Sequence, residues 1–196
     1  MIFLQRTFTS LVNAHAGRTQ LKARRCFARM LVAFICTKNL QKRGFMKTVE
    51  IEEKVIYGIS VRTTNTNEMN PETAKIGQTW QKFDNEVTVD YQNGERVYGV
   101  YYNYESDANG EFDVLAGCEK DNVTLDKAII QKGKYLIFEA KAKTQDDNAR
   151  IQAVIETWGK IWQYFGDENS EYKRTYKTDF EYYKNQTDID IYIAIN

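Results

Sequence analysis

After residue 52, apolar and polar positions first alternate and then repeat with helical spacing. This pattern predicts a strand followed by a helix. Residues 53–65, EKVIYGISVRTTN, alternate β-branched and polar side chains, which is typical of a strand. Residues 70–87 begin beside a proline and then repeat apolar positions with helical spacing. The apolar positions of this predicted helix are Ile76, Trp80 and Phe83.

The same order of elements then recurs along the chain. Two aromatic-rich segments, 95–106 and 110–120, flank the turn sequence DANG and predict a β-hairpin. Residues 133–143 alternate like a strand, residues 146–165 have the period of a helix, and residues 178–196 form two short strands around a polar turn. The apolar stripe expected on the second helix is Ile151, Ile155, Trp158 and Trp162.

Two copies of a β-α-β-β unit, residues 52–121 and 132–195, predict an α+β fold. Units related by a pseudo-twofold axis would share one antiparallel sheet with two main helices, and a ligand cleft would lie at their junction. No proline-rich or glycine-rich linker separates the units, so we expect a single domain over residues 46–196.

A carboxylate in the last pair of strands is the first candidate for chemistry. Glu181 stands between Phe180 and Tyr182 in a segment whose pattern favours burial. A charged group beside aromatic rings loses hydration and regains it only from a hydrogen-bond donor or a positive charge. Either a ligand supplies that partner or the chain does, through one of three nearby cations: Lys173, Arg174 and Lys177.

Charge divides the chain into two parts. Residues 1–45 hold nine of the 27 Lys and Arg and none of the 27 Asp and Glu, so residues 46–196 carry a formal net charge of −9. An acidic body is not expected to bind nucleic acid directly. The basic leader, residues 1–45, is typical of a transit peptide or a basic interaction helix, and equally of a start codon placed too early, because Met46 opens a compact pattern.

The remaining composition excludes several classes of function. The only histidine, His15, lies in the leader, so the body offers no Ser-His-Asp or Cys-His machinery and no histidine-containing metal site. No phosphate-binding glycine motif occurs, and no cofactor is expected. Three cysteines without regular spacing indicate a reducing compartment, the cytoplasm by default, and the apolar run 30–36 is too short to span a membrane.

Residues 47–196 resemble the GyrI-like effector-binding domain of AraC-type and MerR-type regulators, in its free-standing form. The resemblance is carried by the order and spacing of YGISVRTTN, the Trp80-x-x-Phe83 helix, YGVYYNYESDANGEFDVLAGCE, GKYLIFEAK, TWGKIWQYF and YKRTYKTDFEYY with DIDIYIAIN. It implies a protein that binds lipophilic, cationic or aromatic compounds in an aromatic-lined cleft with a carboxylate. Glu181 best matches that carboxylate.

Strand alternation selects the side chains expected around it. Glu181 and Tyr183 point to one face of their strand, and the helix would add Trp158 and Trp162 as walls. The candidate ligand-binding residues are Glu181, Tyr183, Trp158, Trp162, Tyr101, Glu105, Phe138 and Tyr57. Each aromatic residue among them also fits a place in the core, and Glu105 also fits a solvated turn.

The sequence is also compatible with two functions other than ligand binding. Some GyrI-like proteins hydrolyse strained-ring electrophiles, and Glu181 as base with Tyr183 as proton donor would need neither histidine nor metal. The gyrase-inhibitor name of the family suggests antagonism of a protein partner, which the acidic body permits without requiring it.

Overall fold

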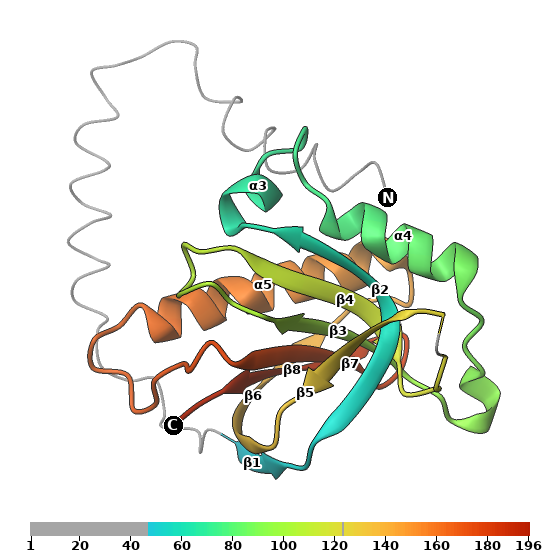
Figure 1. Cartoon of the computed structure of the whole chain (residues 1–196). Helices are drawn as coiled ribbons and strands as arrows, with labels where there is room; N and C mark the ends of the chain where they lie inside the picture. The colour runs from blue at the N-terminus through green and yellow to red at the C-terminus, as the bar shows by residue number, and fades with distance from the viewer. Residues whose placement is uncertain (1–46, 123) are drawn as a thin grey trace. The chain divides into compact units, whose positions relative to one another are not determined.

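The structure, a computed structural model, describes residues 47–122 and 124–196 (Figure 1). The predicted leader, residues 1–45, lies outside the described residues. None of the described helices combines the length and the apolar character that crossing a membrane requires.

Eight antiparallel strands form one sheet in the order β1-β6-β8-β7-β3-β4-β2-β5. The strands are β1 (Thr48–Ile51), β2 (Lys54–Thr63), β3 (Val97–Tyr102), β4 (Phe112–Cys118), β5 (Asp126–Ile130), β6 (Gly133–Lys141), β7 (Thr178–Tyr183) and β8 (Asp188–Ala194). The helices are α3 (Asn65–Met69), α4 (Ile76–Glu86) and α5 (Asp147–Phe165), with a short 3₁₀ turn at Tyr91–Asn93.

The predicted repeat is confirmed by the strand order. The unit β2-α4-β3-β4 and the unit β6-α5-β7-β8 occupy opposite halves of the sheet and meet where β3 pairs with β7. Two further strands were not predicted: β1 pairs with β6 of the second unit, and β5 pairs with β2 of the first. The strand that precedes each repeat, β1 before the first and β5 before the second, therefore pairs in the opposite half of the sheet. The sheet curls so far that Thr178 of β7 donates a hydrogen bond to the carbonyl of Ile129 in β5.

Side-chain hydrogen bonds define where the two main helices begin. The Asp146 carboxylate accepts a bond from the Ala149 amide, which caps α5 where the sequence predicts its start. Helix α4 starts later than the predicted residue 70, because Glu68 of α3 accepts bonds from the amides of Lys75 and Ile76. The Glu68 carboxylate thus satisfies two backbone amides at the start of α4 that have no partner within the helix.

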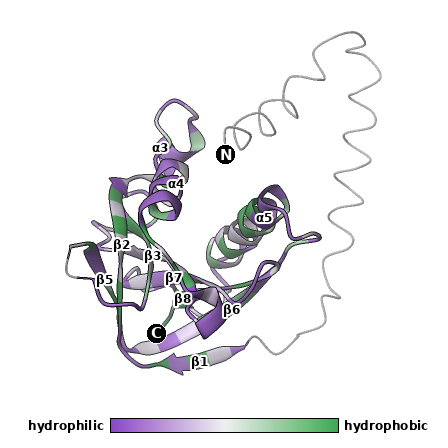
Figure 2. Cartoon of the chain, turned by 90° about the vertical axis from the view of Figure 1, so that its right-hand side faces the viewer, coloured by the Kyte–Doolittle hydropathy of each residue, from purple (hydrophilic) through white to green (hydrophobic). Residues whose placement is uncertain are grey.

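Both main helices cover the same face of the sheet, α4 over β2 and β4 and α5 over β6 (Figure 2). Each has its own apolar cluster beneath it. The cluster under α4 contains Ile59, Phe83, Val97 and Ala116, and the cluster under α5 contains Ile161, Ile191 and Ile193. The central strands β3 and β7 lie between these clusters.

The predicted apolar stripe of α5 is wrong in part. The buried positions are Ala153, Thr157 and Ile161, whereas Ile155 and Trp162 remain 37% and 44% exposed. The small side chains of Ala153 and Thr157 let the helix lie close to the sheet. The larger side chains of Ile155 and Trp162 therefore face solvent. Helical spacing alone does not reveal which side of a broad apolar band meets the sheet.

The opposite face of the sheet holds a separate core rich in aromatic residues. Tyr98, Tyr135 and Phe180 are buried there, and Tyr192 stacks on Phe180 with ring centroids 4.3 Å apart. Apolar side chains of the curled edge strands, such as Ile56 of β2 and Ile130 of β5, complete this core.

Candidate functional site

Glu181 lies at the centre of the sheet, where the two repeats meet. It is paired across the strands with Gly99 of β3 and with Ile191 of β8. Its side chain points to the helix-covered face, and the residue is only 2% exposed. The predicted burial of this carboxylate is therefore confirmed.

Three uncharged donors bind the buried carboxylate. Tyr101 Oη and Trp158 Nε1 donate to Oε1 at 2.8 and 2.7 Å, and Tyr183 Oη donates to Oε2 at 2.7 Å. The donors come from β3, α5 and β7. Tyr101 lies two residues beyond Gly99, and Tyr183 lies two residues beyond Glu181. Because side chains two residues apart on a strand point to the same face, both hydroxyls lie on the face of the sheet that carries the Glu181 carboxylate.

Within residues 47–122 and 124–196, no cationic side chain pairs with Glu181. Burial raises the pKa of its carboxyl group, and the three hydrogen bonds act in the opposite direction because they stabilise the charged form. Among the described residues, none of the salt bridges includes Glu181. The buried anion is satisfied by hydrogen bonds alone.

The alternative of a structural ion pair with Arg174 is wrong, because Arg174 belongs to another carboxylate. Its guanidinium lies 2.6 Å from Asp179 Oδ2, and the side chains of the pair are 6% and 0% exposed. Tyr104 donates to the same Asp179 oxygen, and the amide of Ala194 donates to the other. The guanidinium also lies 5.6 Å from the ring of Trp158, so this pair supports one wall of the Glu181 site.

A second tryptophan covers the carboxylate from the other helix. A Cβ atom built on Gly99 would lie 3.0 Å from Trp80 Cζ2 and 3.1 Å from Glu181 Oε2, so a larger residue at this position would push these two side chains aside by a few tenths of an ångström. Trp80 packs edge-on against Tyr183 at 5.2 Å, and Tyr101 packs edge-on against Trp158 at 5.0 Å. All four aromatic residues are partly exposed above the buried carboxylate.

The four aromatic residues form two pairs related by the pseudo-twofold axis. Residues 79–83, TWQKF, match residues 157–161, TWGKI, so Trp80 and Trp158 occupy equivalent positions in the two helices. The pairing of β3 with β7 likewise relates Tyr101 to Tyr183 about the Gly99–Glu181 pair. The sequence pattern marks Trp80 as an apolar position of its helix, and it was not among the candidate ligand-binding residues, although this short repeat was the signal for its role.

The structure separates the remaining candidate residues from Glu181. Phe138 faces the helices but lies two strands away, where its ring packs against Tyr164 and Phe165. Trp162 is exposed one turn beyond Trp158.

Tyr57 and Glu105 also lie apart from the carboxylate. Tyr57 is in β2, on the far side of β3 and β4, and its hydroxyl interacts with Asp121. Glu105 is exposed in the hairpin after β3, where its carboxylate accepts a bond from the Glu111 amide. The arrangement thus brings together Glu181, Tyr183, Trp158 and Tyr101 from the expected set.

Comparison with known proteins places the chain in a family. Residues 47–195 match the family model named Cass2, integron-associated effector binding protein. An integron cassette protein from the mobile metagenome of Vibrio cholerae has 38% sequence identity and a TM-score of 0.65, over 77% of this chain and 95% of that one. A search of curated proteins finds no match.

Two less similar structures share the fold. A protein from Staphylococcus aureus described as a bacterial transcription regulation protein has 15% identity and a TM-score of 0.58, over 77% of this chain and 97% of that one. The structure of SAV2435 bound to tetraphenylphosphonium has 15% identity and a TM-score of 0.53, over 77% and 93%. The effector-binding family expected from the sequence is confirmed: the chain belongs to the integron-associated effector-binding proteins.

Proposed function

We propose that this effector-binding protein binds lipophilic aromatic cations at Glu181. The observation that carries the proposal is a buried carboxylate with three neutral hydrogen-bond donors, no cationic partner among the described residues and four partly exposed aromatic residues around it. A buried charge without a counter-charge keeps a desolvation cost that a cationic ligand would offset. Precedent on the same fold comes from SAV2435, whose structure contains a lipophilic cation.

The two tryptophans supply the apolar and π-electron part of the interaction. A delocalised cation next to an aromatic face gains about 0.5–2 kcal/mol, most of all with Trp. Trp80 and Trp158 approach Glu181 from opposite helices, so a flat cation inserted between them would contact both rings. The Glu181 site would select ligands by their positive charge and planar shape. A site of this kind binds many compounds of one class.

Access to the carboxylate is expected to run past Trp80. Among the described residues, Tyr183 alone donates to Oε2, and the other side of this oxygen faces the space above Gly99, next to the Trp80 ring. Trp80 is partly exposed on an 11-residue helix, so a change of its side-chain rotamer would open this space. The bound ligand would then take the place of the Trp80 ring over Gly99.

Acidification is expected to abolish cation binding, and to do so at a higher pH than if Glu181 had the ordinary pKa of a glutamate. The carboxylate attracts a cation only when it is deprotonated, and burial raises its pKa. The affinity for N-methylacridinium, whose charge is permanent, should therefore fall as the pH is lowered, beginning above the usual titration range of glutamate. Fluorescence titrations at several pH values measure this dependence.

The Glu181→Gln variant is the control for the pH experiment. Its residual affinity should not change with pH over the same range, because the titrating group is gone. An identical pH profile in the wild type and in the variant would show that another group controls binding.

Hydrolysis of a strained-ring electrophile is the second candidate, and the geometry of the hydrogen bonds argues against it. Both oxygens of Glu181 already accept hydrogen bonds, and the Tyr183 hydroxyl donates its proton to Glu181 itself rather than to a substrate oxygen. We expect an aromatic epoxide incubated with the protein to disappear at its background rate. Multiple turnovers that the Glu181→Gln substitution abolishes would establish the hydrolase function instead.

A further inference from the structure

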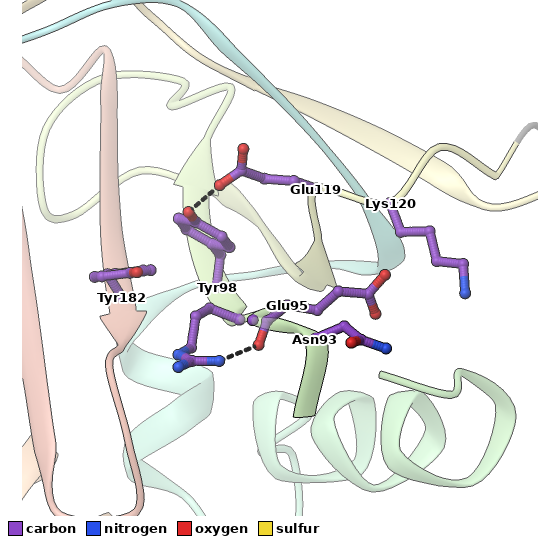
Figure 3. Close-up of a pocket in the computed structure, with 8 residues that line it drawn as sticks. Asn93, Glu95, Tyr98, Glu119, Lys120 and Tyr182 are labelled. Carbon is purple, nitrogen blue, oxygen red and sulfur yellow. Dashed lines mark hydrogen bonds between the residues drawn. The ribbon is translucent and has the colours of Figure 1, made fainter. Parts of the chain in front are cut away.

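The face of the sheet opposite Glu181 contains a hollow, which Figure 3 shows in close-up. Its volume is about 290 Å³, and the residues that matter here are Glu95, Arg96, Tyr98, Glu119, Lys120 and Tyr182. Tyr98 precedes Gly99 in β3, and Tyr182 follows Glu181 in β7. Alternation therefore directs their rings away from the carboxylate, to the opposite face of the sheet. We propose that this hollow binds a small aromatic anion.

The aromatic part of such a ligand has a ready contact surface. The rings of Tyr98 and Tyr182 lie side by side on paired strands, with centroids 5.1 Å apart and planes tilted by 38°. Tyr182 remains partly exposed, whereas Tyr98 is 4% exposed and is held by its hydrogen bond to Glu119 (Figure 3). The partly exposed ring of Tyr182, backed by Tyr98, is suited to offset contact with a further aromatic ring.

The two carboxylates of the hollow are already engaged. Glu119 forms a salt bridge with Lys54 at 2.9 Å and accepts the Tyr98 hydroxyl. Glu95 Oε2 accepts the amide of Asp90 at 2.6 Å, which ties it to the loop before β3. Neither group needs a cationic ligand for its hydrogen bonding.

The two cations of the hollow, in contrast, form no salt bridge with any carboxylate that the structure describes. Arg96 is half-buried, and its guanidinium donates to the backbone carbonyls of Lys184 and Glu95 at 2.9 and 2.7 Å. In the part of the chain that the structure describes, Arg96 and Lys120 take part in no salt bridge. Backbone carbonyls thus hold the Arg96 guanidinium in place, and its positive charge can pair with an anionic ligand.

Size and charge together define the ligand class. Pockets for small molecules commonly measure about 300–1,000 Å³, so this hollow suits a compound of one or two rings. A carboxylate on the ring matches the fork of a guanidinium and gains from a charge-assisted hydrogen bond. A naphthalene carboxylate has both features.

The test compares naphthoate with its neutral isostere naphthamide, by equilibrium dialysis against the full chain. We expect saturable binding of naphthoate that is about tenfold tighter than that of naphthamide, because only the acid pairs with Arg96. The Arg96→Gln substitution should remove this preference, and the Glu181→Gln substitution, on the opposite face, should leave it unchanged. No saturable binding of naphthoate, or equal affinities for the two compounds, would overturn the proposal.

A second variant guards against unfolding, because Arg96 also anchors backbone carbonyls. Lys120 is exposed, so Lys120→Glu should keep the fold and weaken naphthoate binding about threefold or more by reversing a charge at the rim. Unchanged naphthoate affinity in this variant would contradict the site. Naphthoate should also fail to displace N-methylacridinium, and competition between the two would place both ligands at Glu181 and overturn the proposal.

Discussion

The Glu181→Gln substitution is expected to weaken the binding of N-methylacridinium by about 1–3 kcal/mol, or roughly five- to 150-fold, and to leave uncharged acridine almost unaffected. The change keeps the shape of the side chain and removes its charge. A site that selects cations by charge should therefore lose selectivity more than general affinity. Calorimetric titration of both proteins with both ligands, at a pH where acridine is uncharged, measures the difference.

The variant should be no less stable than the wild type, which separates a binding role from a scaffolding role. Gln can keep Oε1 as the acceptor for Tyr101 and Trp158, and its Nε2 can donate to the Tyr183 hydroxyl oxygen. The raised pKa of Glu181 means that the folded protein binds its proton more readily than the unfolded chain does. The charged form therefore lowers stability as the pH rises through the folded-state pKa, and Gln removes this cost.

A destabilised Glu181→Gln protein that loses affinity equally for both ligands would assign Glu181 to the scaffold. Thermal melts run beside the titrations decide between the two outcomes.

Replacing Asp179 by Ala is expected to destabilise the protein by about 3–5 kcal/mol, the largest stability effect that we predict. The substitution leaves the buried Arg174 without its counter-charge and removes the acceptor of the Ala194 amide and the Tyr104 hydroxyl. A buried charge without a partner costs far more than a surface pair contributes. Urea denaturation followed by tryptophan fluorescence gives the free energy of unfolding.

The exposed pair of Glu52 and Lys132 provides the matched control for this experiment. Its partners are 78% and 68% exposed at a separation of 2.9 Å, so the Glu52→Ala substitution should change the unfolding free energy little. Equal effects of the two substitutions would contradict the buried state of the Asp179–Arg174 pair.

Much of the fold follows from patterns in the sequence, and what was missed has physical reasons. The repeat of strand, helix and two strands is visible because each element carries its own periodicity. Strands β1 and β5 escaped prediction because they are short and lie at the sheet edges, where polar residues are tolerated. Their exchange between repeats depends on pairing across the whole chain, which no local window contains.

The candidate site was predictable to a similar extent. Alternation along β7 joined Tyr183 to Glu181, and the aromatic neighbours of Glu181 indicated its burial. The register that sets Gly99 opposite Glu181 depends on tertiary structure and could not be deduced locally. The pairing of Arg174 with Asp179 was missed for the same reason, since three basic residues near Glu181 were equivalent in the sequence.

A crystal structure with bound N-methylacridinium is the decisive experiment for cation binding at Glu181. We expect the cation between Trp80 and Trp158, above Gly99, with its charged ring in contact with Glu181 Oε2 and with the Trp80 ring displaced from its present place. The Asp179–Arg174 pair and the three donors on Glu181 should be unchanged. A cation bound elsewhere on the protein while Trp80 still covers Gly99 would rule out Glu181 as the cation-binding carboxylate.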